Sequence, residues 1–462
     1  MKLHWLKQYS DSKRLLLIFS GWSVDWHLFT GYTYPAKYDV AVVWDYADLS
    51  TGIFANMRYY DETIVIAWSF GVACFDRIYQ KLPDELNINC AIAVNGTTHP
   101  VDDALGIPKD IFAATLSGLS EDSLSSFQRR ICGGGVRFRE FKTVLQEGAD
   151  NIDSLKRQLE TFQPSNEVVA RQNGVIWDRA FISERDMIFP ATNMVHAWNN
   201  SPTATTCIAG SHLPDFQHII STCIRDKALI EQQFSASLNT YDENAEVQTK
   251  AARHLTDIWN IPSSTTEILE IGPGSGTLSR EITRRIPEAR LTWIDLTNIA
   301  PEGCEGRFIH GDAETEIRRL PNESFDAIIS ANSVQWFHSP LRFLQQAYRV
   351  LRKGGSIVLS TFGPGNLKEL DSANGGISLP YLSCDDWRHI ASAAGLEIER
   401  IESETMTIEF NSGRDMINHL KKTGVNALTH TSGHNRYAAL KALMNSGNCR
   451  LTFTPLYLVL KK

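Results

Sequence analysis

Three residues in the first half of the chain have the types and the order of a catalytic triad: Ser69, Asp186 and His212. A serine hydroxyl becomes a nucleophile when a base takes its proton, and the base needs an acid to orient it. Ser69 stands in the run Ala67-Trp68-Ser69-Phe70-Gly71, which follows the G-x-S-x-G pattern of a sharp strand-to-helix turn, with the small Ala67 in place of the first glycine. The order of the three residues in the chain and the predicted turn at Ser69 together favour a serine hydrolase over a chance match.

Strand-like runs must position these residues. Each of the three comes shortly after a run that favours a buried strand: residues 62–67, 179–182 and 203–208. A further apolar run, residues 15–19, ends just before Trp22. Acyl transfer also needs two N–H donors for the oxyanion, and we expect them to be the backbone N–H groups of Trp22 and of Phe70, the residue after the nucleophile.

The acid of the triad has more than one candidate. Asp102 and Asp103 follow the strand-like run 91–94 and compete with Asp186. His212 also has an alternative interpretation, as an ordinary loop histidine. The assignment of Asp186 and His212 therefore rests on their order and on their places at strand ends.

The segment from about residue 108 to residue 175 has helical spacing and few strand-like runs. An insertion at this place is interpreted as a helical lid over the serine that shapes an acyl pocket. It contains Arg129 and Arg130, in a chain whose net charge is -8. A basic cluster is usually a solvated face, and here we expect it to dock an acidic carrier protein.

A second kind of chemistry is indicated by a glycine-rich run in the other half of the chain. The apolar run 267–271 carries an acid, Glu270, and leads into three alternate glycines, Gly272, Gly274 and Gly276. Glycines let the backbone approach a ligand closely, and the N-terminus of the helix that follows points toward that ligand. Asp295 closes the next strand-like run, about 20 residues after the turn, where a ribose-binding acid belongs. This pattern favours a nucleotide-type cofactor site over a mere tight connection.

The rest of the second half alternates strand-like and helical runs. Strands are expected over residues 307–314, 325–332 and 356–361, with a helix over 341–351 that ends at the glycines 354 and 355. This alternation predicts a doubly wound parallel sheet with its ligand at the carboxyl ends of the strands.

Length and composition set the frame for both sites. A chain of 462 residues is expected to form two or three domains, and we place them at residues 1–222 and 228–462, with a break near 221–233. The charge of -8 argues against general nucleic-acid binding, and no apolar run suggests a membrane span or a signal peptide. The eight cysteines form no C-x-x-C pair, so we expect reduced thiols in the cytoplasm, without a metal or disulfides.

Residues 1 to about 220 resemble the BioG-type pimeloyl-ACP methyl ester esterases in the segments AWSFGV, VNGTTHPVDDALGIP, FQRRICGG, SERDMIF and GSHLPDF. That family has an α/β-hydrolase fold with a helical lid. The resemblance implies that Ser69 is the nucleophile, His212 the base and Asp186 the orienting acid.

The second half resembles the class I methyltransferases that use S-adenosylmethionine. Within them it is most similar to the BioC-type malonyl-ACP O-methyltransferases, in the segments YDENAEVQ, SANSVQWF, STFGPGNLKEL and LKKTGVNA. The resemblance implies that the glycine loop lies by the methionine part of the cofactor and that Asp295 takes the ribose hydroxyls. It also implies that Asp312 receives the adenine amino group beside Ala313. Glu270 and Asn332 are included in the same site.

Taken together, the two halves predict a bifunctional enzyme of biotin synthesis that acts on acyl carrier protein. One half would methylate the carboxylate of malonyl-ACP, which needs no base because the acid is already ionised. The other would hydrolyse the methyl ester of pimeloyl-ACP, with acyl length deciding which ester is cleaved. Tyr241, Trp336 and Phe337 are candidates for closing the methylation site. The alternative is a methyltransferase for a small-molecule acid, fused to a hydrolase-like domain that only docks a carrier.

Overall fold

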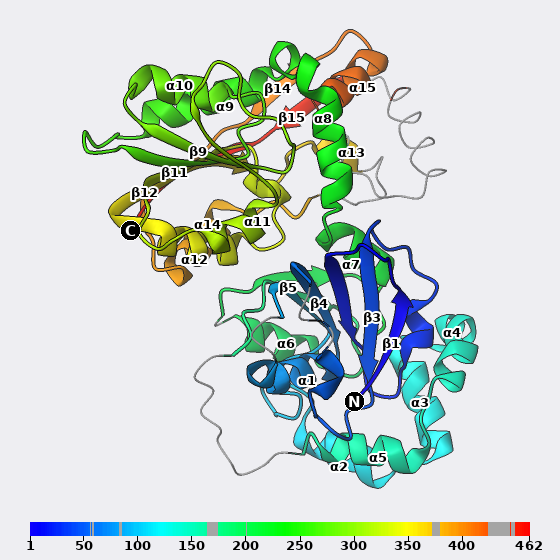
Figure 1. Ribbon diagram of the computed structural model, residues 1–462. Coiled ribbons are helices and arrows are strands. Elements are labelled where there is room, and N and C mark those ends of the chain that lie inside the picture. The colour runs from blue at the N-terminus through cyan, green and yellow to red at the C-terminus, as the bar shows by residue number, and fades with distance from the viewer. Residues whose placement is uncertain are drawn as a thin grey trace. The chain divides into compact units, whose positions relative to one another are not determined.

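A computed structural model describes residues 1–55, 57, 60–82, 86–163, 174–199, 201–371, 379–423, 444 and 449–462, without the side chains of Asn239 and Asp242. Parts of the expected lid and of the LKKTGVNA segment lie outside these residues. The chain divides into two compact units, Met1–Gln217 and His218–Lys462 (Figure 1). None of the described helices combines the length and the apolar character that crossing a membrane requires.

The first unit is built on a seven-stranded sheet with the order β1-β3-β2-β4-β5-β6-β7. Its strands are β1 (Lys2–Lys7), β2 (Arg14–Phe19), β3 (Tyr38–Trp44), β4 (Glu62–Trp68), β5 (Ile88–Val94), β6 (Arg179–Ser183) and β7 (Ala204–Ile208). All neighbouring pairs are parallel except β1 with β3. The strands β4 and β5 are buried along their whole length, as continuous apolar runs in a parallel sheet require.

The edge strand β1 was not predicted from the sequence. It pairs antiparallel with β3 and is only half-buried, so its pattern lacks the continuous apolar run that marked the central strands. Its conformation depends on the neighbouring strand, which local sequence does not reveal.

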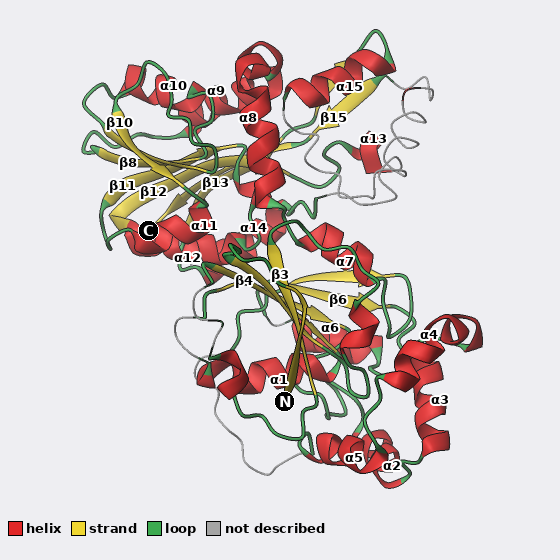
Figure 2. Cartoon of the chain, turned by 45° about the vertical axis from the view of Figure 1, so that its right-hand side comes forward, coloured by secondary structure: helices red, strands yellow, loops and turns green. Residues whose placement is uncertain are grey.

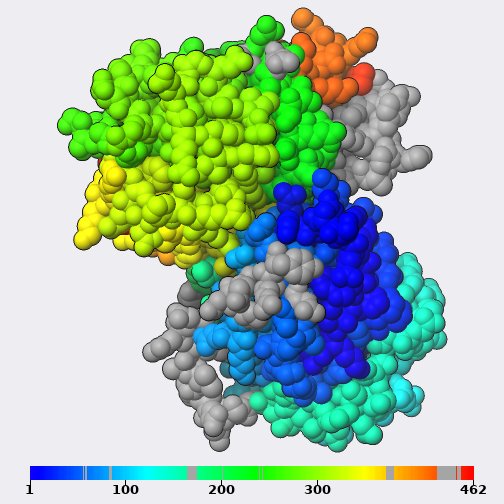
Figure 3. All heavy atoms as spheres, viewed as in Figure 1, coloured from blue at the N-terminus to red at the C-terminus, as the bar shows by residue number. Residues whose placement is uncertain are grey.

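The helices of the first unit are α1 (Phe70–Ile78), α2 (Lys109–Ser117), α3 (Glu121–Ile131), α4 (Gly135–Glu147), α5 (Ile152–Glu160), α6 (Ala191–Trp198) and α7 (Phe216–Cys223), the last crossing the unit boundary. Short 3-10 turns are η1 (Trp26–Phe29), η2 (Gly52–Phe54) and η3 (Tyr79–Lys81). Helices α2 to α5 follow one another in the chain and gather beside the sheet (Figure 2). In Figure 3 the same segment, coloured cyan, forms part of the exposed surface of this unit.

The second unit contains a seven-stranded sheet with the order β10-β9-β8-β11-β12-β16-β13 and a small β14-β15 pair. The strands are β8 (Glu267–Ile271), β9 (Arg290–Asp295), β10 (Gly306–His310), β11 (Phe325–Ala331), β12 (Leu351–Phe362), β13 (Glu397–Ser403), β14 (Met406–Glu409), β15 (Arg450–Phe453) and β16 (Pro455–Lys461). The five strands from β10 to β12 are parallel, as expected. The prediction of a wholly parallel sheet is wrong, because β16 runs antiparallel to both β12 and β13.

The helices of the second unit are α8 (Lys227–Asn244), α9 (Glu246–Ile258), α10 (Thr277–Arg285), α11 (Ala313–Glu316), α12 (Pro340–Val350), α13 (Lys368–Asp371), α14 (Cys384–Ala393) and α15 (Gly413–Lys422), with the 3-10 turns η4 (Ile317–Arg319) and η5 (Val334–Trp336). Figure 1 shows α9 and α10 on one face of the sheet and α12 and α14 on the other. The apolar core beneath α9 and α10 includes Leu255, Leu278, Ile282 and Trp293.

Two expected boundaries differ from the structure. The helix α12 was expected to continue to a glycine turn at 354 and 355, but β12 begins directly after it, at Leu351. Pairing between Phe325 and Leu351, followed by a shift of register, extends the strand through Gly354, which adopts φ +74°. The expected break at 221–233 narrows to the turn between α7 and α8, because α8 already begins at Lys227.

Candidate functional sites

Ser69 occupies a strained turn between β4 and α1. Its φ of 59° and ψ of -126° lie in a region that residues with a side chain rarely adopt. The turn is held by close backbone packing: a Cβ on Gly71 would lie 2.5 Å from the carbonyl oxygen of Phe19, and one on Gly96 would lie 2.3 Å from that of Ser69. The chain therefore needs glycine at both places to keep this turn.

His212 connects Ser69 to Asp186. Its Nε2 lies 2.9 Å from the Ser69 hydroxyl oxygen, and its Nδ1 lies 2.7 Å from the Asp186 Oδ2. The side chains of His212 and Asp186 are 1% and 0% exposed. The other carboxylate oxygen of Asp186 accepts the backbone N–H groups of Ile188 and Phe189, which fixes its orientation. An imidazole held in this way can take a proton from the serine and pass it on.

The competing acids lie elsewhere. The Asp102 carboxylate accepts the backbone N–H groups of Ala104 and Leu105, and Asp103 accepts that of Lys109. Both are therefore engaged in local turns, and it is Asp186 that the structure brings to His212.

The two expected oxyanion donors lie beside the serine. Phe70 is the first residue of α1, so its N–H has no acceptor within the helix. The loop that contains Trp22 approaches from β2, since a Cβ on Gly21 would lie 3.3 Å from the Cβ of Ser69. The indole of Trp22 is anchored by a 3.0 Å hydrogen bond to the carbonyl oxygen of Leu155, in α5.

Aromatic side chains from the helical segment line the neighbourhood of Phe70 and Trp22. Phe127 of α3 packs edge-on against Trp22 at 4.8 Å, while Phe112 and Phe162 lie 6.3 and 4.9 Å from Phe70. These rings are 1–7% exposed and form a buried apolar cluster between the helical segment and the residues that flank the catalytic turn.

Arg137 has a role that the sequence did not reveal. Its guanidinium donates to the carbonyl oxygens of Leu213 and Pro214, at 2.5 and 3.0 Å, and to the Ser211 hydroxyl, at 3.1 Å. It therefore braces the loop that carries His212. Arg129 and Arg130, in contrast, lie in the last turn of α3 with exposed side chains.

The second unit has a cavity at the carboxyl ends of β8, β9 and β11. It is lined by most of the residues predicted to hold a cofactor: Glu270, Gly272, Gly274, Asp295, Asp312, Ala313 and Asn332. Gly276 is instead the N-cap of α10, with φ +82°. A Cβ on Gly274 would meet no atom within 4 Å, so the glycine turn leaves open space for a ligand.

The two acids on either side of the glycine turn are buried. Asp295 accepts the Gly274 N–H at 3.0 Å and both donors of Thr297, and burial raises its pKa. Glu270 accepts the Ser279 hydroxyl at 2.5 Å and the Trp293 indole N–H at 3.1 Å. Burial raises the pKa of Glu270 to about 7. Asp295 thus ties the glycine turn to β9.

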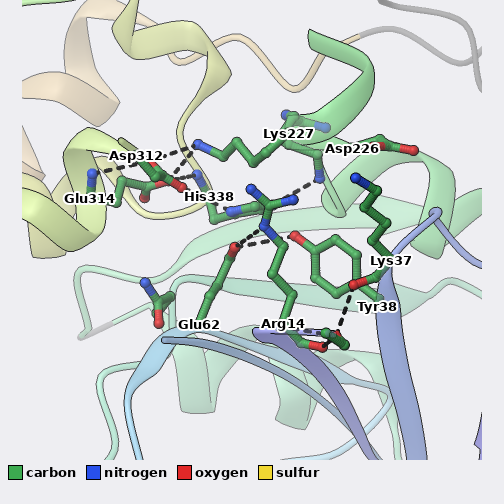
Figure 4. A network of polar contacts seen from close by, with 12 residues as sticks. Arg14, Lys37, Tyr38, Glu62, Asp226, Lys227, Asp312, Glu314 and His338 are labelled. Carbon is green, nitrogen blue, oxygen red and sulfur yellow. Dashed lines mark hydrogen bonds and ion pairs between the residues drawn. The ribbon is translucent and has the colours of Figure 1, made fainter. Parts of the chain in front are cut away.

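A buried ionic network borders the same cavity (Figure 4). Lys227, at the start of α8, extends toward Asp312 and Glu314, with its Nζ at 3.4 and 3.0 Å from their carboxylates. Glu314 also accepts the backbone N–H groups of His338 and Ser339. Burial acts to raise the pKa of Glu314, but Lys227, the side chain of His338 and the N–H of Ser339 hold it well below its usual range. Sequence reasoning missed Lys227, because nothing near it marks a buried cation.

The three aromatic residues expected to close the site, Tyr241, Trp336 and Phe337, all line this cavity. Tyr241 comes from α8 and Trp336 from η5, the turn that follows β11. With four described acids and a single described lysine among its lining side chains, the cavity suits a cationic ligand with hydroxyl groups.

Comparison with known proteins gave two family models. The model described as "Pimeloyl-ACP methyl esterase BioG" matches residues 1–223, and the model described as "Methyltransferase domain" matches residues 269–359. A malonyl-[acyl-carrier protein] O-methyltransferase of Bacteroides fragilis is 30% identical, across 97% of this chain and 93% of its own length. One of the same description from Haemophilus influenzae is 33% identical, across 51% of this chain and 94% of its own.

Two solved structures cover about one half of the chain each. The crystal structure of BioG from Haemophilus influenzae is 29% identical with a TM-score of 0.40, and it covers 46% of this chain and 94% of that one. A methyltransferase from Bacillus halodurans is 18% identical with a TM-score of 0.35, covering 46% and 99%.

Proposed function

The chain belongs to the malonyl-[acyl-carrier protein] O-methyltransferase family, and from that premise we propose that it is a bifunctional enzyme of biotin synthesis. Its second part methylates the free carboxylate of malonyl-ACP. Its first part hydrolyses the methyl ester of pimeloyl-ACP to pimeloyl-ACP and methanol. We assign these activities to residues 228–462 and 1–222, in the cytoplasm.

The second unit has the Rossmann-like fold of class I methyltransferases, and its cofactor is S-adenosylmethionine. The cofactor supplies a methyl group on a cationic sulfur. The open space at Gly274 and the acids of the cavity fit such a ligand. We propose that the glycine turn holds its methionine part, that Asp295 holds its ribose hydroxyls, and that Asp312 and Ala313 hold its adenine.

Methylation of a carboxylate requires little acid–base catalysis by the protein. The acceptor is ionised at neutral pH, so no proton has to be removed. The remaining requirements are an in-line arrangement of oxygen and methyl group and the exclusion of water. Tyr241, Trp336 and Phe337 supply apolar walls for this purpose.

For the first unit we propose an α/β-hydrolase whose lid consists of α2 to α5. The observation that supports the esterase is the hydrogen-bonded chain Ser69–His212–Asp186. Ser69 attacks the ester carbonyl while His212 takes its proton, and the oxyanion meets the N–H groups of Trp22 and Phe70. His212 then protonates the departing methanol, and water releases the acyl group by the reverse proton path.

One chain that adds and removes a methyl group has to avoid cleaving its own first product. We propose that acyl length decides: the apolar cluster around Phe127 and Phe112 favours the longer pimeloyl chain. Each buried methylene contributes about 0.8 kcal/mol, so four more methylenes can separate the two esters by about 2–3 orders of magnitude.

The test is mass spectrometry of malonyl-ACP and pimeloyl-ACP methyl ester, each incubated with the chain, with and without S-adenosylmethionine. We expect a methyl ester on malonyl-ACP only with the cofactor, and pimeloyl-ACP without any cofactor. Equal hydrolysis rates for the malonyl and pimeloyl methyl esters would refute selection by length.

A second candidate is a methyltransferase for a small-molecule acid, fused to a first unit that only docks a carrier. The exposed Arg129 and Arg130 support docking in either case. Two tests separate these candidates. Ester hydrolysis that survives Ser69→Ala would favour a first unit that only docks the carrier. Methylation of free acids in place of malonyl-ACP would favour the small-molecule methyltransferase.

A further inference from the structure

A second cavity adjoins the proposed cofactor cavity of the second unit. The two share the side chains of Phe234, Tyr241, Gln248, Asn332 and Trp336. Away from this shared wall, the second cavity reaches apolar residues such as Leu367 and Phe453. A ligand there would therefore lie next to a cofactor bound in the first cavity.

The described lining of the second cavity contains no charged side chain. Its strongest polar groups are four side-chain amides, those of Gln248, Asn332, Gln335 and Asn366. A carboxylate placed there would have to be held by neutral donors.

Three of the four amides already have partners. Asn332 accepts the Ser360 hydroxyl at 3.3 Å, and Gln335 donates to the carbonyl oxygen of Asn332 at 2.5 Å. Asn366 donates to the Tyr381 hydroxyl at 2.8 Å and accepts the Thr454 N–H at 3.2 Å. These contacts orient the three amides and use part of their hydrogen-bonding capacity.

The fourth amide, that of Gln248, differs. Its side chain is 7% exposed and lines both cavities, yet within the described part of the chain it makes no hydrogen bond. Its amide atoms are not among the fully enclosed polar atoms that lack a partner, so they face the space of the two cavities. An amide in this position is free to hydrogen-bond to a ligand there.

We propose that Gln248 binds the acceptor carboxylate through its side-chain NH₂ group and directs it toward the cofactor cavity. This assignment rests on the proposed methylation of malonyl-ACP and names the residue that recognises its free acid. The carboxylate has two oxygens: one accepts from Gln248, and the other remains free to take the methyl group.

A neutral donor suits the reaction. An arginine would hold the carboxylate more tightly, but it would also draw charge from the oxygen that must act as nucleophile. In the transfer a new O–C bond forms while the C–S bond of the sulfonium breaks, and the sulfur keeps the electron pair. No proton moves, so the residue that holds the acceptor needs no titratable group.

The test compares Gln248→Leu and Gln248→Glu in the full chain, in a Ser69→Ala background that suppresses ester hydrolysis. The readouts are methylation kinetics with malonyl-ACP and calorimetric binding of S-adenosylhomocysteine. For Gln248→Leu we expect kcat/KM to fall about 10- to 100-fold, because a hydrogen bond to a charged group is lost. Binding of S-adenosylhomocysteine should stay within about twofold.

Gln248→Glu tests the assignment through the pH dependence of methylation, which a purely structural role of Gln248 would not change. Two carboxylates at one site repel each other unless one of them holds a proton. The deficit of this variant relative to the unchanged chain should therefore be larger at pH 8 than at pH 6. Lys250→Gln, an exposed site on the same helix, serves as the control and should behave like the unchanged chain.

Two results would overturn the assignment. Unaltered kinetics of both Gln248 variants in a chain that methylates malonyl-ACP would show that another residue holds the acceptor. An equal loss of S-adenosylhomocysteine binding would assign Gln248 to the cofactor instead. If the unchanged chain binds the cofactor but leaves malonyl-ACP unmodified, the proposed function itself fails, which is a distinct outcome.

Discussion

The ammonium of Lys227 lies 3.0 Å from the carboxylate of Glu314, and the two side chains are 1% and 5% exposed. Lys227 begins α8, whereas Glu314 belongs to the first turn of α11, two residues after Asp312. The pair therefore joins two elements that border the proposed cofactor cavity. A buried ion pair is costly to break, because the partner that remains is a charge without compensation.

Lys227→Met should lower the free energy of unfolding by about 3–5 kcal/mol and weaken S-adenosylhomocysteine binding. Without the ammonium, the pKa of Glu314 is lowered less, because the largest effect that opposes burial is lost. The folded variant then takes up a proton at a higher pH than the folded unchanged chain, so its deficit should shrink as the pH falls through the unfolded pKa of 4.5. Urea denaturation at several pH values measures this. Lys250→Met breaks an exposed i,i+4 pair instead, and a similar effect there would contradict the interpretation.

Asp186→Asn should reduce hydrolysis of pimeloyl-ACP methyl ester by about 10⁴-fold, because the imidazole of His212 loses the acid that sets its tautomer. Methylation of malonyl-ACP should not change. The matched control is Asp102→Asn, which alters an acid that accepts the local backbone N–H groups of Ala104 and Leu105. If Asp102→Asn removed the hydrolysis and Asp186→Asn did not, the assignment of the acid would be wrong.

Arg137→Met should lower kcat for ester hydrolysis by about 10- to 100-fold with little change in KM. The guanidinium braces the loop of His212, and a small displacement of the base is enough to slow proton transfer. Arg139→Met changes an exposed residue of the same helix and should leave kcat intact. Steady-state kinetics on a small methyl ester separates this effect from carrier docking.

Arg129→Glu together with Arg130→Glu should raise KM for the carrier-bound ester about tenfold or more at low salt, and less at high salt. Hydrolysis of a small methyl ester should be unaffected, because both arginine side chains are exposed and neither belongs to the proposed triad. Lys156→Glu, at an exposed residue of α5, is the control for the change of charge. An equal rise of KM for both substrates would argue against docking.

Glu270→Gln should stabilise the folded chain progressively between about pH 5 and pH 7. Burial raises the pKa of Glu270 to about 7, above its value of 4.5 in an unfolded chain. Over this interval the folded state retains a proton that the unfolded state loses, which lowers the stability of the unchanged chain as the pH rises. Glutamine has no such proton and can still accept from Ser279 and Trp293. The stability difference, measured by urea denaturation, should become constant above about pH 8; a difference that does not vary with pH would show that Glu270 ionises normally.

Much of the architecture follows from local sequence. The apolar runs before Ser69 and before the glycine turn predicted β4 and β8, because a strand buried on both faces needs a continuous apolar run. Neither β1 nor β16 was predicted. The edge strand β1 lacks a continuous apolar run, whereas β16 has one, and only the fold places it antiparallel between β12 and β13.

The candidate sites divide in the same way. By itself the sequence determined the serine turn, the order of the triad and the glycine cradle, because each depends on residue types at short spacing. Only the tertiary structure decided that Asp186 rather than Asp102 meets His212, that Arg137 braces the histidine loop, and that Lys227 is neutralised by Glu314. These relationships join residues far apart in the chain: a buried charge or polar group requires a partner, and folding decides which remote residue supplies it.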